Sequence, residues 1–219
     1  MTNLTKLPSW ADDENIFAVV ETPRGSSCKL DFDPKHGVFA LAKPLMTGLT
    51  DWGFIPSTKA EDGDPLDVLI LHDAQTYPGV VLRCRPVGIL EVEQKSKGKK
   101  ERNDRVFAVP DRSPLETDLK DIRNLPSHAR DDLEQFFRAT NALDNKELKF
   151  LGWHGPNRAA KDHQASVPLD GPRIALSSAS LGRARLRQGG ASEEAERGVL
   201  CIPVPAPLRP ATHDSMSGQ

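Results

Sequence analysis

Cysteine and long apolar runs are scarce in this 219-residue sequence, and each shortage excludes a class of protein. The three cysteines, Cys28, Cys84 and Cys201, lie far apart and form no Cys-x-x-Cys pair, which argues against a disulfide framework or a zinc site. No apolar run approaches the length of about 18 residues that a membrane-spanning helix needs, and the first residues lack the apolar core of a secretory signal. We therefore expect a cytoplasmic protein with no membrane partner.

An excess of positive charge is also missing. The chain has 29 Lys and Arg residues against 31 Asp and Glu residues, a net charge of −2, which argues against a dedicated nucleic-acid binder. One segment, residues 95–102, is nevertheless strongly basic. Two interpretations of it remain open, a solvated hairpin tip or a patch that steers anions towards a site.

Short apolar segments without a regular alternation of strands and helices predict an antiparallel barrel. Residues 28–33 alternate between apolar and charged side chains, as in a strand with one buried face. Within the longest apolar segment, Pro86 and Gly88 predict a bend or bulge. One amphipathic helix is predicted at 127–140. The predicted strands are 16–20, 28–33, 38–41, 66–71, 80–90 and 105–109.

Composition divides the chain into three parts. Residues 1–15 are polar and predict a surface arm, and residues 16–163 carry the strands and the helix. From His154 to the end there is no Phe, Tyr or Trp, and the last fifty residues are rich in Ser, Ala, Gly, Arg and Pro. We expect residues 164–219 to form a disordered or atypical tail.

The most informative segment is the acidic turn, residues 62–67, which read Asp-Gly-Asp-Pro-Leu-Asp. Gly63 permits a sharp turn and Pro65 stiffens the next step, so the chain enters the apolar strand at 66–71 in a fixed direction. A solvated acidic loop is the plain alternative. A calcium-binding EF-hand loop is excluded, because counting from Asp62 places Leu66 at position 5 and Asp67 at position 6.

Clustered carboxylates without histidine or cysteine favour a hard cation such as Mg²⁺. Hydrolysis of a phosphoanhydride needs such a site, because metal ions and basic side chains neutralise the phosphates while a carboxylate takes a proton from the attacking water.

The sequence resembles the family I soluble inorganic pyrophosphatases over about residues 14–160. The family's Asp-x-Asp-Pro-x-Asp signature matches the acidic turn, and other motifs follow in the family's order. They are Val-Val-Glu-Thr-Pro at 19–23, Lys-x-Asp at 29–31, Trp-Gly-Phe-Ile at 52–55, Arg-Cys-Arg-Pro-Val-Gly at 83–88, Phe-Ala-Val-Pro at 107–110 and Phe-Phe at 136–137.

This resemblance implies an α+β, mainly β fold, with a five-stranded OB-type closed barrel and flanking α-helices. It also implies Mg²⁺ as cofactor, pyrophosphate as substrate and a homo-oligomer. The implied metal ligands are Asp62, Asp64, Asp67 and Asp104, the implied catalytic residues are Asp64 as base and Glu21, and the implied substrate-binding positions are Lys29, Lys43, Trp52 and Arg105.

Several positions depart from the family pattern. Lys43 replaces an arginine, so a bidentate contact to phosphate becomes a contact with a point charge. Trp52 replaces a tyrosine, so the phenol hydroxyl is lost at this position. The segment at 46–51 is about three residues shorter. Further replacements are Asp31 for Glu, Asn103 for a metal-binding Asp, Arg105 for Lys, and Thr140-Asn141 for a Tyr-Lys pair.

Three hypotheses follow from these residues. The first is an Mg²⁺-dependent enzyme that hydrolyses pyrophosphate to two orthophosphates. The second is a catalytically weak or inactive paralogue that binds pyrophosphate or another phosphate ligand. The third is a barrel that binds nucleic acid through residues 95–105, although it lacks the interleaved aromatic residues that such binding uses.

Overall fold

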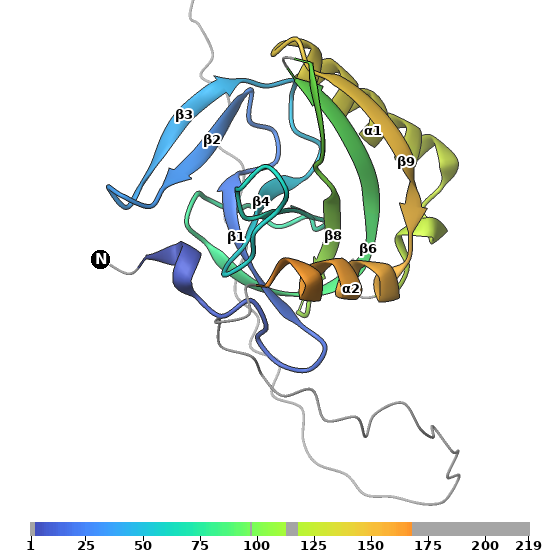
Figure 1. Cartoon of the computed structure of the whole chain (residues 1–219). Coiled ribbons are helices and arrows are strands. Elements are labelled where there is room, and N and C mark those ends of the chain that lie inside the picture. Colours follow the sequence, from blue (N-terminus) through green and yellow to red (C-terminus); the bar gives the residue numbers. More distant parts are fainter. Residues whose placement is uncertain (1–2, 97, 113–117, 168–219) are drawn as a thin grey trace, which may run out of the picture. The chain divides into compact units, whose positions relative to one another are not determined.

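Five strands pair in a ring in the computed structural model, which describes residues 3–96, 98–112 and 118–167 (Figure 1). Each of β1, β4, β5, β8 and β6 pairs with the next, and β6 pairs again with β1. The elements are η1 (Leu4–Lys6), β1 (Ile16–Thr22), β2 (Cys28–Asp33), β3 (Val38–Pro44), β4 (Asp51–Ile55), β5 (Leu66–Ile70), β6 (Val81–Ser96), β7 (Lys99–Arg102), β8 (Arg105–Pro110), η2 (Ile122–Asn124), α1 (Ser127–Ala142), β9 (Glu147–His154) and α2 (Pro156–Ser166).

The predicted strands and helix are present, but the antiparallel assignment was wrong for one pair of neighbouring strands. Strands β5 and β8 run parallel, with Asp67 opposite Arg105 and Val68 opposite Val106. The sheet is therefore mixed. This parallel pair matters for the site, because it brings the end of the acidic turn beside the first residue of β8.

Strands β4, β7 and β9 were not predicted. The sequence of β4 begins with Asp51 and contains Gly53, both of which weaken a strand signal. Gly53 is required because a Cβ atom there would lie 1.9 Å from the carbonyl oxygen of Val19 on β1. Close packing of the β1 and β4 backbones thus explains Gly53, a residue type that in the sequence alone indicates an interrupted strand.

The predicted bend in β6 is confirmed. The pairing register of β6 with β8 shifts between Pro86 and Gly88, which marks a bulge. A Cβ atom on Gly88 would lie 2.2 Å from a side-chain carbon of Ile122. The bulge therefore lets η2 pack directly on the strand.

Two apolar clusters lie on opposite faces of the ring strands. Val68 and Ile70 of β5 belong to one cluster, while Leu69 between them belongs to the other. The first cluster also contains Ala159 of α2, and the second contains Phe137 of α1. The burial of β5 on both faces, predicted from its continuous apolar sequence, is thus confirmed.

The basic segment at 95–102 belongs to the hairpin of β6 and β7, and three of its described lysines, Lys95, Lys99 and Lys100, are paired with glutamates. Lys100 lies 3.0 Å from Glu93, Lys99 lies 3.6 Å from Glu101, and Lys95 lies 3.7 Å from Glu147. These pairs favour the interpretation as a solvated hairpin over a patch that steers anions.

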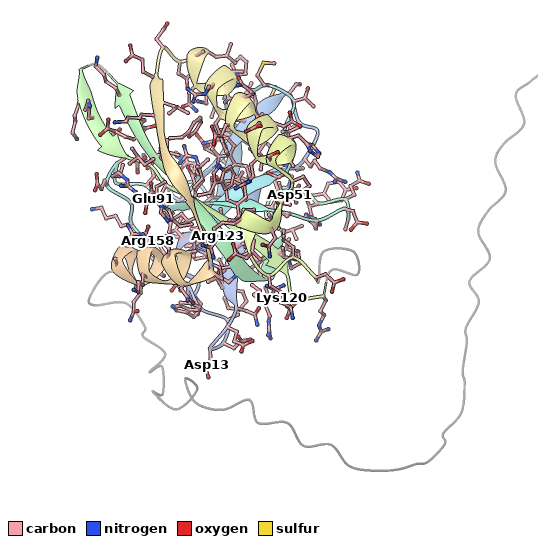
Figure 2. The ribbon with its side chains drawn as sticks, turned by 90° about the vertical axis from the view of Figure 1, so that its right-hand side faces the viewer. Asp13, Asp51, Glu91, Lys120, Arg123 and Arg158 are labelled. Atoms are coloured by element: carbon pink, nitrogen blue, oxygen red, sulfur yellow. The ribbon has the colours of Figure 1, made fainter. Side chains whose placement is uncertain are left out.

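Helix α2 is fixed to the sheet by an ion pair and by a buried ring. Arg158 Nε lies 2.8 Å from Glu91 Oε1 on β6 (Figure 2). His163 is 1 % exposed, its ring centroid lies 4.5 Å from that of Trp10, and neither of its ring nitrogens has a hydrogen-bond partner among the described residues. Burial lowers the pKa of His163 to about 4, so the ring is neutral in the folded protein.

The predicted boundary between residues 163 and 164 falls inside α2, which ends at Ser166. Most of the predicted tail, residues 168–219, lies outside the described residues. Among the helices that the structure describes, none has the length and apolar character needed to cross a bilayer.

We expect His163→Leu to stabilise the protein, because it removes two buried nitrogens that lack partners, a gain of about 1–3 kcal/mol. The gain should be larger at low pH. The pKa of His163 is 6.5 in the unfolded chain and about 4 in the folded protein. The unfolded chain therefore binds a proton as pH falls below 6.5, whereas the folded protein binds it only near pH 4. Wild-type stability consequently falls as pH falls from 6.5 to 4.

Denaturant unfolding at pH 8 and at pH 5 checks this expectation. The gain in unfolding free energy should be roughly 2 kcal/mol greater at pH 5. Equal gains at the two pH values would show that His163 accepts its proton as readily in the folded state as in the unfolded state.

Candidate functional site

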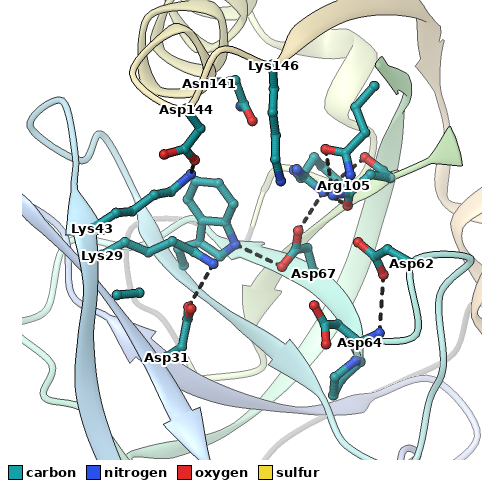
Figure 3. Close-up of a pocket in the computed structure, with 15 residues that line it drawn as sticks. Lys29, Asp31, Lys43, Asp62, Asp64, Asp67, Arg105, Asn141, Asp144 and Lys146 are labelled. Carbon is teal, nitrogen blue, oxygen red and sulfur yellow. Dashed lines mark hydrogen bonds and ion pairs between the residues drawn. The ribbon is translucent and has the colours of Figure 1, made fainter. Parts of the chain in front are cut away.

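A cavity of about 340 Å³ opens beside the acidic turn (Figure 3). Its walls come from β2, β3, β4, β5, β6 and β8, from the acidic turn, from Asn103 before β8, and from the end of α1 with the segment that joins α1 to β9. Seven of the residues predicted for the site line it, namely Lys29, Lys43, Trp52, Asp62, Asp64, Asp67 and Arg105. The other lining residues are Asp31, Ala42, Pro65, Gln94, Asn103, Asn141, Asp144 and Lys146.

The acidic turn is held by its own backbone. Ala60 N donates to Asp64 O at 2.8 Å, and Gly63 has a φ of 96°, a conformation that glycine adopts readily. The Asp64 N–H also donates to Asp62 Oδ1 at 3.2 Å. The predicted rigid entry into β5 is therefore present, with the Asp62 and Asp64 side chains in the exposed part of the turn.

Both carboxylate oxygens of Asp67 interact with side chains of the protein itself. Arg105 Nη1 lies 2.5 Å from Asp67 Oδ2, and Trp52 Nε1 donates to Asp67 Oδ1 at 3.1 Å. The guanidinium carbon of Arg105 lies 5.3 Å from the Trp52 ring centroid and 5.9 Å from that of Phe137. Because Arg105 is 3 % exposed, this ion pair is shielded from water on most sides.

Asn103 is turned towards Arg105. Arg105 Nη1 donates to the backbone oxygen of Asn103 at 2.9 Å and also to its side-chain oxygen. The position where the family pattern has a carboxylate thus holds a neutral acceptor for the arginine.

Two lysines of the cavity also have carboxylate partners. Lys29 Nζ lies 2.8 Å from Asp31 and 5.1 Å from the Trp52 ring centroid, and Lys43 is paired with Asp144. Burial acts to lower the pKa of Lys29, but the charges of Asp67 and Asp31 outweigh it and raise the pKa above its ordinary value. Lys29 therefore stays charged in the site.

Asp62 lies in a field of like charge. Although the residue is exposed at the surface, neighbouring protein atoms displace some water from its carboxyl, and this, together with the charges of Asp67 and Asp64, raises the pKa of Asp62. Neither the Asp62 nor the Asp64 carboxylate has an ion-pair partner among the described residues. These two side chains are therefore open to a cation.

Glu21 lines an adjoining cavity of about 200 Å³ that shares Lys29, Asp31, Asp64 and Asp67 with the first. Its Oε1 accepts a hydrogen bond from Phe32 N at 2.7 Å, and the residue is 9 % exposed. Burial raises the pKa of Glu21 to about 7, because it removes water from the charged form.

Asp104 lies away from both of these cavities. Its Oδ1 accepts from Val92 N at 2.7 Å, and its carboxylate receives two hydrogen bonds from Arg102 Nη2, at 2.9 and 2.7 Å. It faces a different surface depression, beside α2. The structure therefore does not bring this predicted metal ligand to the acidic turn.

Sequence reasoning missed Gln94, Asp144 and Lys146 as lining residues. Gln94 lies near the end of the long strand β6, and it reaches the cavity because of how β6 packs against segments distant in the sequence. Asp144 and Lys146 follow the C-terminus of α1. A polar segment with Asn145 after an amphipathic helix does signal a turn, but it does not show what the turn faces.

The donor set fits a hard divalent cation in chemical type. The carboxylates of the acidic turn offer only oxygen ligands, and Mg²⁺ is typically held by one or two carboxylates together with water and substrate phosphates. Across the described parts of the chain, no three His, Cys, Asp or Glu side chains are close enough to enclose an ion. The structure thus offers Asp62 and Asp64 as open ligands, with Asp67 held by Arg105.

Comparison with known proteins gives a consistent result. The family model described as inorganic pyrophosphatase matches residues 18–168. An inorganic pyrophosphatase from Synechocystis is 35% identical over 170 residues, which cover 76% of this chain and 94% of that protein. One from Halobacterium salinarum is 36% identical over 151 residues, covering 67% and 82% of the two chains.

Solved structures agree with these sequence matches. The crystal structure of inorganic pyrophosphatase from Thermus thermophilus superimposes with a TM-score of 0.70 at 34% identity, covering 76% of this chain and 97% of that one. The mainly β fold of this chain is thus shared with solved inorganic pyrophosphatases. The chain belongs to the inorganic pyrophosphatase family, which confirms the resemblance seen in its sequence.

A prediction follows from the buried carboxyl of Glu21. Its folded-state pKa of about 7 exceeds its unfolded value of 4.5, so the stability it contributes is fully present below pH 4.5 and is lost as pH rises through 7. We expect Glu21→Gln to remove this loss. Between pH 5 and pH 8, the variant should gain roughly 2–3 kcal/mol of unfolding free energy relative to wild type.

The measurement is denaturant unfolding in the presence of a chelator, so that no divalent ion contributes. Glu14→Gln, at an exposed glutamate, is the matched control and should show no such change with pH. A difference between Glu21→Gln and wild type that stays constant with pH would mean that Glu21 is ionised in the folded protein throughout this range.

Proposed function

We propose that this protein hydrolyses inorganic pyrophosphate to two orthophosphates at the cavity beside the acidic turn. The observation that carries the proposal is the meeting of the three aspartates of the acidic turn with Lys29, Lys43 and Arg105 around one cavity, in a chain of the inorganic pyrophosphatase family. A cavity of this size admits a small anion. The cations attract it, and the open carboxylates can hold a metal ion beside it.

The divalent ion is proposed to be Mg²⁺, with Asp62 and Asp64 as its ligands, while Asp67, also predicted as a ligand, stays bound to Arg105 and Trp52. When bound, it would neutralise charge on the phosphate oxygens. Asp104 is left out of this site, because its carboxylate is bound to Arg102 and to the Val92 backbone.

The reaction forms a bond from a water oxygen to one phosphorus and breaks that phosphorus's bond to the bridging oxygen. The second orthophosphate leaves with that oxygen. We assign Asp64 as the base that takes the water proton, because it has no cationic partner among the described residues and lies on both adjoining cavities. Glu21, with its raised pKa, would hold a proton or transfer one in the adjoining cavity of about 200 Å³.

The basic residues differ in how they can act on the phosphates. Lys29 and Lys43 carry charge at the cavity wall, and Arg105 contributes its charge while it holds Asp67. Trp52 has its indole N–H on Asp67, so its proposed role is to position that carboxylate.

Three other parts of the sequence interpretation stay proposals. The five-stranded ring would form a closed OB-type barrel, the protein would assemble as a homo-oligomer, and it would work in the cytoplasm. The domain limits at residues 16 and 163 likewise stay predictions.

The direct test is release of orthophosphate from pyrophosphate with Mg²⁺. We expect turnover by the wild-type chain and a fall of about 100-fold or more in kcat for Asp64→Asn, because proton transfer to a positioned base typically contributes at least that much. Asp132→Asn, at an exposed position on α1, is the matched control and should retain activity.

An absence of turnover in the wild-type chain would contradict the proposal. Thermal stabilisation by pyrophosphate without turnover would then support the paralogue that only binds phosphate ligands. Full activity in Asp64→Asn would show that the base lies elsewhere.

A further inference from the structure

Among the described residues, four cationic side chains line the cavity, and Lys146 differs from the other three because it has no carboxylate partner. Lys29 is paired with Asp31, Lys43 with Asp144, and Arg105 with Asp67. The Lys146 ammonium has neither a hydrogen bond nor an ion pair to any of the described residues. Lys146 can therefore bind an anionic ligand without first breaking an ion pair with a carboxylate.

The backbone at Lys146 is firmly held. Asn141 O, at the C-terminus of α1, accepts from Asp144 N and from Lys146 N, both at 3.0 Å. Asn145, between them, has a φ of 54°, a left-handed conformation that asparagine tolerates better than most residues. These bonds end the helix and reverse the chain, so the base of the Lys146 side chain starts from a fixed point.

The side chain extends from this turn into the cavity. Figure 3 shows Lys146 descending from the α1 side towards the region of Arg105 and Asp67. The residue is only partly exposed. A flexible lysine stem with a fixed base and an unpaired ammonium is suited to bind phosphate as a mobile point charge.

Asn141 cannot take this role. It stands where the family pattern has a lysine, but its side chain is neutral, and its Nδ2 donates to Phe137 O within α1 at 2.9 Å. The cavity wall formed by the end of α1 therefore has a positive charge at Lys146, five residues further along the chain, and not at position 141.

We propose that Lys146 binds a phosphate group of the substrate, as the main cationic contact from the turn between α1 and β9. This inference rests on the proposed function for the identity of the substrate. Asp144, in the same turn, holds Lys43, so the turn supplies one free cation and fixes another.

The test compares Lys146→Gln, Lys146→Arg and Lys149→Gln with the wild-type protein in the presence of Mg²⁺. Lys149 is an exposed lysine on β9 outside the cavity and serves as the matched control. Two quantities are measured for each protein. They are the kinetic constants for pyrophosphate and the Kd of the non-hydrolysable analogue imidodiphosphate.

We expect Lys146→Gln to raise KM and the analogue's Kd by about 10-fold or more, with a smaller effect on kcat, because one charged contact to phosphate is lost. Lys146→Arg should restore most of the affinity, and Lys149→Gln should behave as wild type. Melting temperatures without ligand should be alike, since the ammonium has no hydrogen bond or ion pair with the described residues to lose.

An unchanged Kd in Lys146→Gln would overturn the inference while leaving the proposed function intact. So would failure of arginine to restore binding that glutamine loses. If the wild-type chain bound the analogue in a manner dependent on Lys146 but released no orthophosphate, the inference would stand and the proposed hydrolysis would fail.

Discussion

The ion pair between Arg105 and Asp67 determines how the charges of the cavity are arranged. The parallel pairing of β5 with β8 places the two residues opposite each other, and aromatic rings from β4 and α1 enclose the guanidinium. Breaking such a pair would leave a charge without a partner in a shielded place, which is costly. The pair therefore fixes Asp67 and leaves Asp62 and Asp64 as the carboxylates of the acidic turn that are free to bind a metal ion.

This arrangement divides the site into held and open groups. The held groups are pairs of opposite charge that shape the wall, as Lys43 does with Asp144. The open groups are two carboxylates on one side and the Lys146 ammonium on another, which suit a metal ion and a phosphate respectively. Because Arg105 and Asp67, like Lys43 and Asp144, come from segments far apart in the sequence, the fold has to form before these pairs are positioned. Electrostatic preorganisation of this kind is the usual source of catalysis at phosphate-transfer sites.

Local patterns in the sequence were sufficient for much of the fold and for the acidic turn. The apolar run of β5, the bulge at Pro86 and Gly88, and the helix carrying Phe137 each follow from residues close together in the chain. The parallel pairing of β5 with β8 depends on strand order, which local periodicity does not encode. The direction of Asp104 and the place of Lys146 were missed for the same reason, since each depends on which distant element lies opposite.

A crystal structure of the protein grown with Mg²⁺ and imidodiphosphate would show directly which groups bind the metal ion and the phosphates. We expect the analogue in the cavity beside the acidic turn, with a metal ion on Asp62 and Asp64, Arg105 still on Asp67, and a phosphate oxygen within hydrogen-bonding distance of Lys146. An analogue bound on another surface, with this cavity left without ligand at saturating concentration, would contradict this expectation.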